Sequence, residues 1–228
     1  MSVKVFSGNI NIIEANGNIS PYEKFIITFN PDGTKLLKTL SISPDGNLIR
    51  DVNQYFSSEW FDIEGIARLF YQNQYVGTIL RRVIEGNLHS TIWNNKKEFD
   101  HTEFKISKNM HLGFHSLMND AWKMNFLDTS HSEDQDIIVH TISETWNGST
   151  ITHGKELKSS AIYEGEEDLK LIAGNFYCQK FLWRTPSNKL LKIWRTSEAK
   201  VLARMEVIIG KNKGSIYELT NFKEESIG

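Results

Sequence analysis

The chain has 228 residues, a formal charge of −2 at pH 7 and a pI near 6.4. A nucleic-acid or anionic-membrane partner requires a basic surface, so we expect neither, and no apolar run reaches the roughly 20 residues that span a bilayer. The single cysteine, Cys178, excludes an internal disulfide. The N-terminus shows no charged segment followed by a long apolar one, so we expect no signal peptide and predict a cytoplasmic protein.

Turn signals occur at short intervals along the chain. They are NPDGT at Asn30, SPDGN at Ser43, EGN at Glu85, WNGS at Trp146, YEGEED at Tyr163, TPSNK at Thr185 and GKNKGS at Gly210. Each places Gly, Asn, Asp or Pro where a tight turn needs them, and the runs between them are rich in residues that favour strands. The pattern predicts an antiparallel β meander, and with it an all-β protein that forms a single antiparallel domain over residues 1–228.

Arginines on the expected strands raise the question of which side chains point inward. Arg81 and Arg82 are adjacent, and each has apolar neighbours on its own side of the strand, so one of the two must point inward. An inward arginine needs a partner such as Glu85, Glu206 or a ligand carboxylate. We therefore take Arg81 as a candidate ligand-binding residue, with an Arg–Glu pair on the wet face as the structural alternative.

Other arginines are interpreted in the same way. Arg50 and Asp51 are adjacent and opposite in charge, and we interpret them as a surface pair. The question of an inward side chain applies also to Arg184, Arg195 and Arg204.

The stretch HLGFHSLMNDAWKMNFLD, from His111 to Asp128, differs from the rest of the chain. Its apolar residues recur at i, i+3, i+4, i+7 and i+8, which predicts a short helix from Phe114 to Asn125 crossing the mouth or face of the β body. His111 and His115 are four apart and would share one face of a helix, as metal ligands do. The spacing selects no third ligand, so we predict no metal and no cofactor.

His115 and Asp120 are the candidate catalytic residues. Imidazole titrates near neutral pH and can both take and give a proton, and a carboxylate can hold the ring in one tautomer. In the structural alternative, His115 caps the start of the helix, Asp120 bonds nearby backbone and Trp122 belongs to the core. An ideal helix places Asp120 roughly 140° from His115, so a direct bond needs an irregular helix start or a partner strand.

Aromatic residues are plentiful, with six Trp, thirteen Phe and seven Tyr. In NFYCQKFLWRT, alternation places Tyr177, Phe181 and Trp183 on one side of a strand and Cys178 on the other, where we expect a buried, inert thiol. Both sides carry apolar groups, which predicts either two packed layers or a core on one side and a ligand cavity on the other. We take Trp122, Tyr177, Phe181 and Trp183 as candidate ligand-binding residues.

The C-terminal segments LIAGNFYCQKFLWRT, KLLKIWRT and VLARMEVIIGKNKGSIYELTNF resemble the last strands of the LolA/LolB-like antiparallel half-barrel superfamily. FHSLMNDAW is similar to a His-Pro-Leu…Asp-Gly-Trp element of uncharacterised bacterial relatives, with Ser116 in place of proline and Ala121 in place of glycine. The resemblance covers about two thirds of the chain. It implies a deeply curved sheet, partly closed by helix, that holds an apolar ligand; without an export signal we do not expect lipoprotein transport.

The sequence contains no GxSxG nucleophile motif and no phosphate-binding loop, so a nucleotide enzyme is not expected. We expect a strongly curved antiparallel sheet, a half-barrel or calycin-like barrel, that binds an apolar, lipid-like or polyketide-like molecule in an aromatic-lined cavity. We expect it to act as a cofactor-free cyclase, isomerase or lyase in small-molecule biosynthesis. The alternatives are a carrier or sensor without chemistry and an interaction protein whose aromatic residues form a partner surface.

Overall fold

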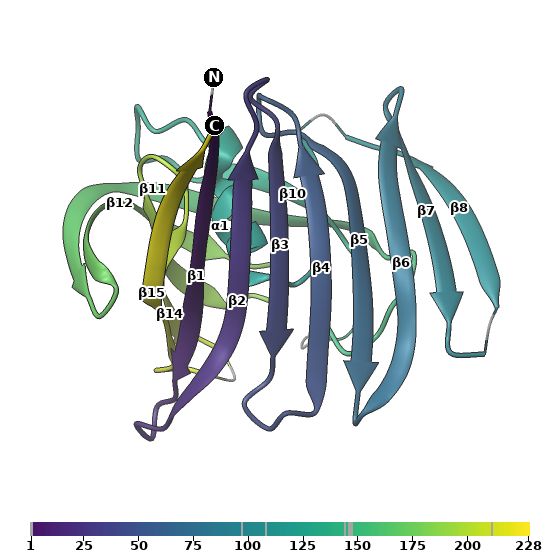
Figure 1. The fold of residues 1–228 in the computed structure, drawn as a ribbon, viewed down its shortest axis with the longest axis horizontal. Coiled ribbons are helices and arrows are strands. Elements are labelled where there is room, and N and C mark those ends of the chain that lie inside the picture. The colour runs from purple at the N-terminus through teal and green to yellow at the C-terminus, as the bar shows by residue number, and fades with distance from the viewer. Residues whose placement is uncertain (1, 97, 108, 144, 146–147, 211) are drawn as a thin grey trace.

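A computed structural model of the chain describes residues 2–96, 98–107, 109–143, 145, 148–210 and 212–228. Its strands belong to one 15-stranded sheet (Figure 1). They are β1 Val3–Ile13, β2 Ile19–Phe29, β3 Lys35–Ile42, β4 Leu48–Phe56, β5 Asp62–Tyr71, β6 Gln74–Ile84, β7 Asn87–Asn94, β8 Phe99–Lys105, β9 His111–Gly113, β10 Gln135–Thr141, β11 Lys155–Leu171, β12 Gly174–Arg184, β13 Leu190–Thr196, β14 Leu202–Ile209 and β15 Ile216–Ile227.

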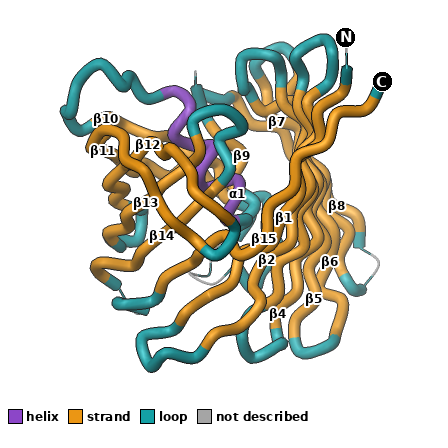
Figure 2. Tube along the Cα trace, turned by 60° about the vertical axis from the view of Figure 1, so that its left-hand side comes forward, coloured by secondary structure: helices purple, strands orange, loops and turns teal. Residues whose placement is uncertain are grey.

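The sheet runs in the order β8 to β1, then β15 to β9, so the first and last strands pair at its middle. All neighbours are antiparallel except β9 and β10, which are parallel. The sheet curves strongly, so that the N-terminal arm, β1 to β8, faces the C-terminal arm, β9 to β15, with helix α1 between them (Figure 2). No pairing joins the edge strands β8 and β9 in the described part of the chain, and the predicted all-β half-barrel is confirmed.

Side chains of the N-terminal arm hold the open edge of the C-terminal arm. In β9, the backbone N–H of Leu112 donates to Asp62 Oδ2 at 3.1 Å, and Gln54 Nε2 donates to the Leu112 carbonyl at 3.3 Å. Arg81 bonds the carbonyls of His140 and Thr141 in β10. These contacts bond backbone groups of the edge strand β9 and of its neighbour β10, so the two arms are joined without a continuous ladder.

The predicted helix is shorter than expected. Helix α1 spans Leu117–Trp122 and continues as a 3-10 helix, η1, over Lys123–Phe126. It cannot begin at Phe114, because His115 has a left-handed backbone conformation with φ of 57°. Ser116 instead occupies the N-cap and accepts the backbone N–H of Asn119, as short hydroxyl side chains do at helix starts.

Most predicted turns connect neighbouring strands, but YEGEED at Tyr163 does not. Strand β11 runs through it, and the chain accommodates the extra residue as a β-bulge between Tyr163 and Gly165, where Gly165 has φ of 103°. The predicted WNGS turn begins at Trp146 and Asn147, which lie outside the described residues.

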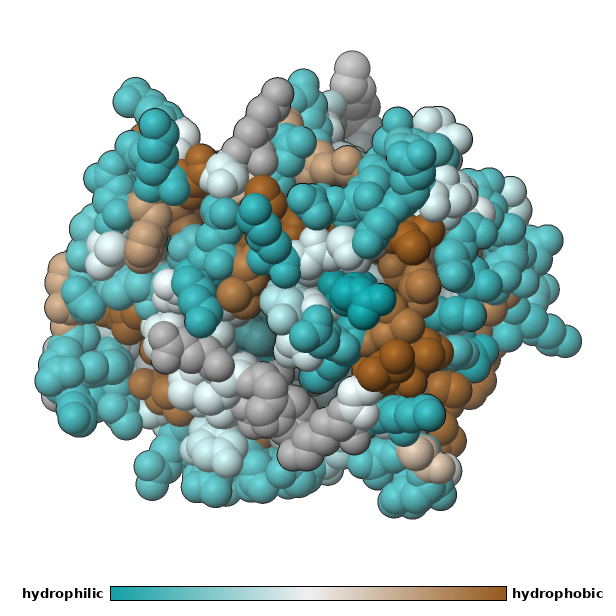
Figure 3. Space-filling model, turned by 180° about the vertical axis from the view of Figure 1, so that it is seen from behind, coloured by the Kyte–Doolittle hydropathy of each residue, from teal (hydrophilic) through white to brown (hydrophobic). Residues whose placement is uncertain are grey.

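Two groups of buried apolar side chains form the core. The larger lies around α1 and includes Phe56, Trp122 and Phe181, and the smaller lies between β4 to β7 and β9 and includes Leu112 and Phe114. From behind, hydrophilic side chains cover most of the surface, and hydrophobic ones gather beside its centre (Figure 3). Among the described residues, no helix has the length and apolar character needed to cross a membrane.

Candidate functional site

A cavity of about 970 Å³ lies between the two arms of the sheet, which is within the size range of small-molecule sites. The turns after β1, β3, β12 and β14 contribute to its lining, and α1 reaches it through Leu117 and Asp120. The C-terminal arm contributes an apolar wall of Val139, Leu157, Trp183, Leu191, Met205 and Val207. The N-terminal arm contributes polar groups that include Tyr22, Ser43, Asn47 and Arg50. The C-terminal arm and its turns also contribute polar groups, among them Ser187, Lys189 and Asn212, so the cavity lining combines apolar and polar groups.

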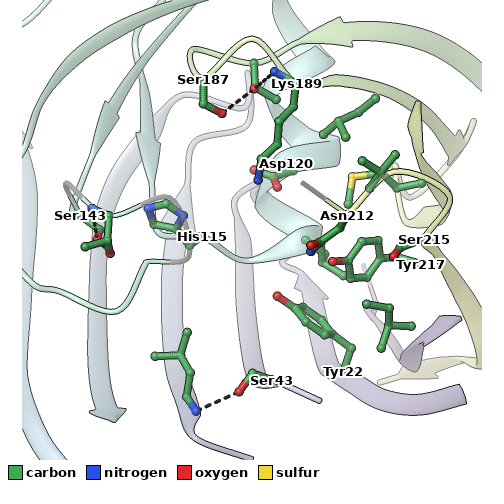
Figure 4. Close-up of a pocket in the computed structure, with 18 of the residues that line it drawn as sticks. Tyr22, Ser43, His115, Asp120, Ser143, Ser187, Lys189, Asn212, Ser215 and Tyr217 are labelled. Carbon is green, nitrogen blue, oxygen red and sulfur yellow. Dashed lines mark hydrogen bonds between the residues drawn. The ribbon is translucent and has the colours of Figure 1, made fainter. Parts of the chain in front are cut away.

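His115 is partly buried in the wall of this cavity (Figure 4). Its Nε2 lies 3.1 Å from the Thr141 hydroxyl, and its carbonyl oxygen accepts a 2.6 Å hydrogen bond from Arg50. Burial, and then the positive charges of Arg50, Lys123, Lys189 and Arg81, lower the pKa of His115 well below its usual value. The imidazole is therefore neutral at physiological pH.

Asp120 lies across the cavity from His115 (Figure 4). Its carboxylate forms an ion pair with Lys123, whose ammonium also lies 5.2 Å from the centre of the Trp183 ring. The side chain of Lys189, from the turn after β12, points toward Asp120 (Figure 4). No hydrogen bond joins His115 to Asp120 among the described contacts, so the two residues share the cavity but do not form the predicted dyad.

Two tyrosines line the cavity beside Asp120. The rings of Tyr22 and Tyr217 meet edge to face with centroids 5.0 Å apart, and their hydroxyls point into the open space (Figure 4). Burial raises the pKa of both phenols. They are therefore neutral and can donate or accept hydrogen bonds within the cavity.

Glu23 fixes the position of α1 behind the cavity. Its buried carboxylate accepts hydrogen bonds from Ser41 at 2.6 Å and from the backbone N–H groups of Leu117 and Met118, each at 3.0 Å. Burial raises the pKa of Glu23, while these hydrogen bonds oppose the increase. A carboxyl at the first turn satisfies helix N–H groups that have no partner within the helix.

Of the predicted ligand-binding residues, only Trp183 lines the cavity. Trp122 is in the core, where its ring packs edge to face on Phe56 and Trp60 and its Nε1 donates to the Lys200 carbonyl. The structural alternative for Trp122 is therefore correct. Its position in the helical stripe indicated burial but could not indicate which partner would cover it.

Arg81 points inward as predicted, but it contacts neither a carboxylate nor the cavity. It is fully buried and donates to three backbone carbonyls, those of His140 at 2.7 Å, Thr141 at 2.8 Å and His153 at 2.5 Å. Burial lowers the pKa of Arg81 to about 9. Arg82 faces outward, 3.5 Å from Glu64. Arg81 thus joins strands and is not placed to bind a ligand.

Tyr177 and Phe181 do not line the cavity either. Tyr177 is exposed and bonds Glu166, whereas Phe181 is fully buried beside Tyr163. The buried positions of β12 change parity between Cys178 and Phe181, directly opposite the bulge between Tyr163 and Gly165 of β11. Cys178 is buried, as predicted, and burial raises its pKa to about 12.

The His111 and His115 pair does not lie on a helix. His111 begins β9, with its Nδ1 3.5 Å from Asp62 Oδ2 and its ring 4.8 Å from that of Phe126. Within the described ranges, no group of three or more His, Cys, Asp or Glu side chains is placed to hold a metal ion.

The remaining arginines occupy three different environments. Arg184 is exposed, and Arg204 lies 3.0 Å from Glu206. Arg195 is buried, and its guanidinium donates to the carbonyl of Ala121 and to Asn125 at the end of the helical segment. None of the three lines the cavity.

Arg50 is the main site residue that the sequence interpretation missed. It is 5% exposed and faces the cavity, and Asp51 pairs instead with Arg68 at 3.1 Å, so the expected surface pair is wrong. The signal was present in LIRDVNQYF, where alternation puts Arg50 on the same side as Leu48 and Val52. For Tyr22, Lys189 and Tyr217, the sequence contains no comparable signal, because segments far apart in the chain bring them together.

No family model matches the chain, and no curated protein matches it in sequence. Among solved structures, it is similar to a β-barrel-like protein of the domain of unknown function DUF1849 from Brucella abortus, with a TM-score of 0.56 and 8% identity over 97% of each chain. A DUF1089 family protein from Pseudomonas aeruginosa gives a TM-score of 0.44 and 9% identity over 79% of this chain and 86% of that one. A protein with a YmcC-like fold from Bacteroides fragilis gives a TM-score of 0.36 and 12% identity over 97% of this chain and 95% of that one. The first similarity shows a β-barrel-like fold and nothing finer.

Proposed function

We propose that the cavity binds a small molecule with a substantial apolar part, and that the protein acts as a carrier or sensor of this ligand. The observation that supports this is the cavity of about 970 Å³, which has an apolar wall on the C-terminal arm and polar groups around it from both arms. Pockets of this size with a few convergent polar groups are the usual form of small-molecule sites. We also propose that the protein is related to the LolA/LolB-like half-barrels and that it is located in the cytoplasm.

The test is to measure binding of the neutral apolar dye Nile red, and to identify co-purified ligand by native mass spectrometry. Val207 is buried in the apolar wall on β14, so Val207→Trp should fill part of the cavity and weaken dye binding about tenfold or more. Ile209, on the same strand, is 52% exposed and does not line the cavity, so Ile209→Trp is the matched control. Equal dye binding by two folded variants would contradict a ligand site in this cavity.

A second candidate function is cofactor-free catalysis as a cyclase, isomerase or lyase. The observation that favours it is His115, a neutral imidazole held with a left-handed backbone in the cavity wall, since strained residues cluster at functional sites. Once the co-purified ligand is identified, its conversion would be followed with wild type, His115→Ala and Asp120→Asn. Loss of about 100-fold in turnover with ligand still bound would support catalysis. Unchanged turnover in a folded His115→Ala protein would eliminate it.

A further inference from the structure

The two edges of the sheet differ in how they are covered. The edge strand β9 bonds side chains of the N-terminal arm, among them Asp62 and Gln54. Strand β8 pairs only with β7 among the described strands, and no described segment lies along its outer side (Figure 1). It contains no proline or glycine, and its ladder with β7 has no bulge. The outer side of such a strand presents backbone N–H and C=O groups that can pair with another strand.

The side chains of β8 form an inner and an outer row. Thr102 is opposite Ser90 of β7, which is fully buried, so the even-numbered residues of β8 face the inner side of the curved sheet. The odd-numbered residues face the outer side and are all exposed, and they are Phe99, His101, Glu103 and Lys105. The outer row therefore carries an aromatic ring, an imidazole, a carboxylate and an ammonium group.

Two identical edge strands pair antiparallel around a two-fold axis perpendicular to the sheet. Such an axis keeps the inner sides of both copies on the same side, so it passes beside one residue of the strand. At Asp100 or Glu103 it would place two like carboxylates directly opposite each other, which is destabilising. At His101 it would leave one end of β8 unpaired. At Thr102, the middle of the seven residues, the whole strand is paired.

Pairing centred on Thr102 is complementary in charge. It places His101 of each copy opposite Glu103 of the other, so an imidazole faces a carboxylate twice. When the Thr91 hydroxyl donates to His101 Nδ1, 2.9 Å away, the imidazole proton lies on Nε2 and can be donated to the opposite carboxylate. Within its own copy, Glu103 has a long contact of 4.0 Å with His89. Favourable pairs directly opposite each other stabilise one register over the others.

The same pairing covers an exposed aromatic group. Phe99 is 64% exposed and packs edge to face on Trp93, which is 38% exposed, with ring centroids 5.8 Å apart. The register centred on Thr102 places Phe99 of each copy opposite Lys105 of the other. The methylene groups of the lysine can then cover the ring, and its ammonium can lie against the ring face.

The inner row brings no like charges together in this register. Asp100 of each copy is opposite Phe104 of the other, and the carboxylate of Asp100 lies 3.0 Å from His153 Nε2 of its own copy. Thr102 is opposite Thr102. Both rows of β8 are therefore compatible with the same axis.

From these observations we propose that the protein forms a two-fold symmetric dimer, in which the β8 strands of two copies pair antiparallel with the axis at Thr102. The sheet of one copy then continues into the sheet of the other. None of the residues of β8 lines the cavity, so the dimer interface and the proposed ligand site are independent.

Sedimentation equilibrium of the full chain tests the association. The chain has a mass of 26.3 kDa, and the fitted mass should rise toward twice this value as the concentration increases. His101→Glu would place carboxylates opposite each other at two points of the interface and should weaken the dimer about tenfold or more. The exchange variant, His101→Glu with Glu103→His, makes the opposite groups complementary again and should restore the affinity. His131→Glu makes the same charge change on an exposed loop and is the matched control.

A cysteine placed at the axis tests the register. Opposite Cα atoms of an antiparallel pair are about 4.5–5.5 Å apart, which a disulfide can span. Thr102→Cys in a Cys178→Ala protein should therefore form a disulfide-linked dimer on mild oxidation. Ser130→Cys in the same background, on an exposed loop, should form one far more slowly. Circular dichroism and urea denaturation show whether each variant is folded.

The possible results decide between this interface and others. A mass that rises with concentration, falls for His101→Glu and recovers in the exchange variant supports the proposal, as does the disulfide at position 102. A monomer at every concentration up to about 1 mM overturns it. A dimer that His101→Glu leaves unchanged, or thiols that link no faster at position 102 than at position 130, overturns it as well, because association then uses a different surface.

Discussion

Arg50 on β4 donates a 2.6 Å hydrogen bond to the carbonyl oxygen of His115, a residue 65 positions away in the chain. This contact holds His115 in its left-handed conformation just before α1 and brings the guanidinium to the same cavity that the imidazole lines. The contacts of Asp62, Gln54 and Arg81 with the C-terminal arm are of the same type. Side chains bonding to backbone carbonyls and N–H groups therefore both close the fold and build the site.

The closely packed junction between the arms should not tolerate a side chain at Gly154. A Cβ there would lie 1.6 Å from the Thr141 carbonyl oxygen and 2.8 Å from Arg81 Nη2, and the backbone φ is +75°. We expect Gly154→Ala to lower the free energy of unfolding by about 3 kcal/mol or more, measured by urea denaturation.

Gly46 is the matched control for Gly154, because its φ of +72° is similar and nothing lies within 4 Å of its Cβ position. Gly46→Ala should lower the free energy of unfolding by only about 1 kcal/mol, because it adds the strain of a side chain at positive φ without a steric clash. Similar losses in the two variants would contradict the close approach seen at Gly154.

Two adjacent arginines should differ greatly in their effect on stability. Arg81→Met removes a buried guanidinium that donates to three backbone carbonyls, and we expect it to lower the free energy of unfolding by about 3 kcal/mol or more. Arg82 is exposed and contacts Glu64 at the surface, so Arg82→Met should cost about 1 kcal/mol or less. Chemical denaturation of both variants gives the comparison, and equal losses would refute the structural role of Arg81.

Stability should decrease in mild acid because of His140. Burial, and then the charge of Arg81, lower the pKa of this imidazole to about 4, and the side chain is almost fully buried against Phe104. Between pH 6.5 and 4, the unfolded chain binds a proton at this position that the folded chain does not, so stability is complete above this window and declines as the pH falls through it. At pH 5 we expect His140 to lower the free energy of unfolding by about 2 kcal/mol relative to its value at neutral pH.

Denaturation of wild type and His140→Gln at pH 7.5 and pH 5 measures this contribution. The variant should lose less stability between the two pH values, while His131→Gln, at an exposed loop position, should behave as wild type. An equal pH dependence for wild type and His140→Gln would exclude His140 as the source.

Cys178 should be unreactive in the folded protein. Burial raises its thiol pKa to about 12, and only the thiolate attacks disulfide reagents. We expect dithionitrobenzoate to react with Cys178 only at the rate of unfolding. A Cys178→Ala, Ser130→Cys protein, with its thiol on an exposed loop, should react within seconds and serves as the control. Rapid reaction of native wild type would show that the thiol is accessible.

The sequence by itself determined the elements of the fold. Gly and Asn in the SPDGN segment at Ser43 predict a turn because such residues adopt its backbone conformations with little strain, and the turn indeed connects β3 to β4. The helical stripe after Phe114 located α1, and the pair Arg81 and Arg82 indicated that one arginine points inward. These are local properties, since a strand period of two and a helix period of 3.6 can be recognised from neighbouring residues alone.

Only the tertiary structure decided which faces form the site. Alternation grouped Tyr177 with Phe181, but the buried positions of β12 change parity opposite the bulge in β11, so Tyr177 is exposed and Phe181 is buried. Arg50 was expected at the surface and lines the cavity, because curvature of the sheet brings β4 opposite β10 to β14. Periodicity tells which side chains share a side of a strand, but what covers that side depends on bulges, curvature and contacts between distant segments.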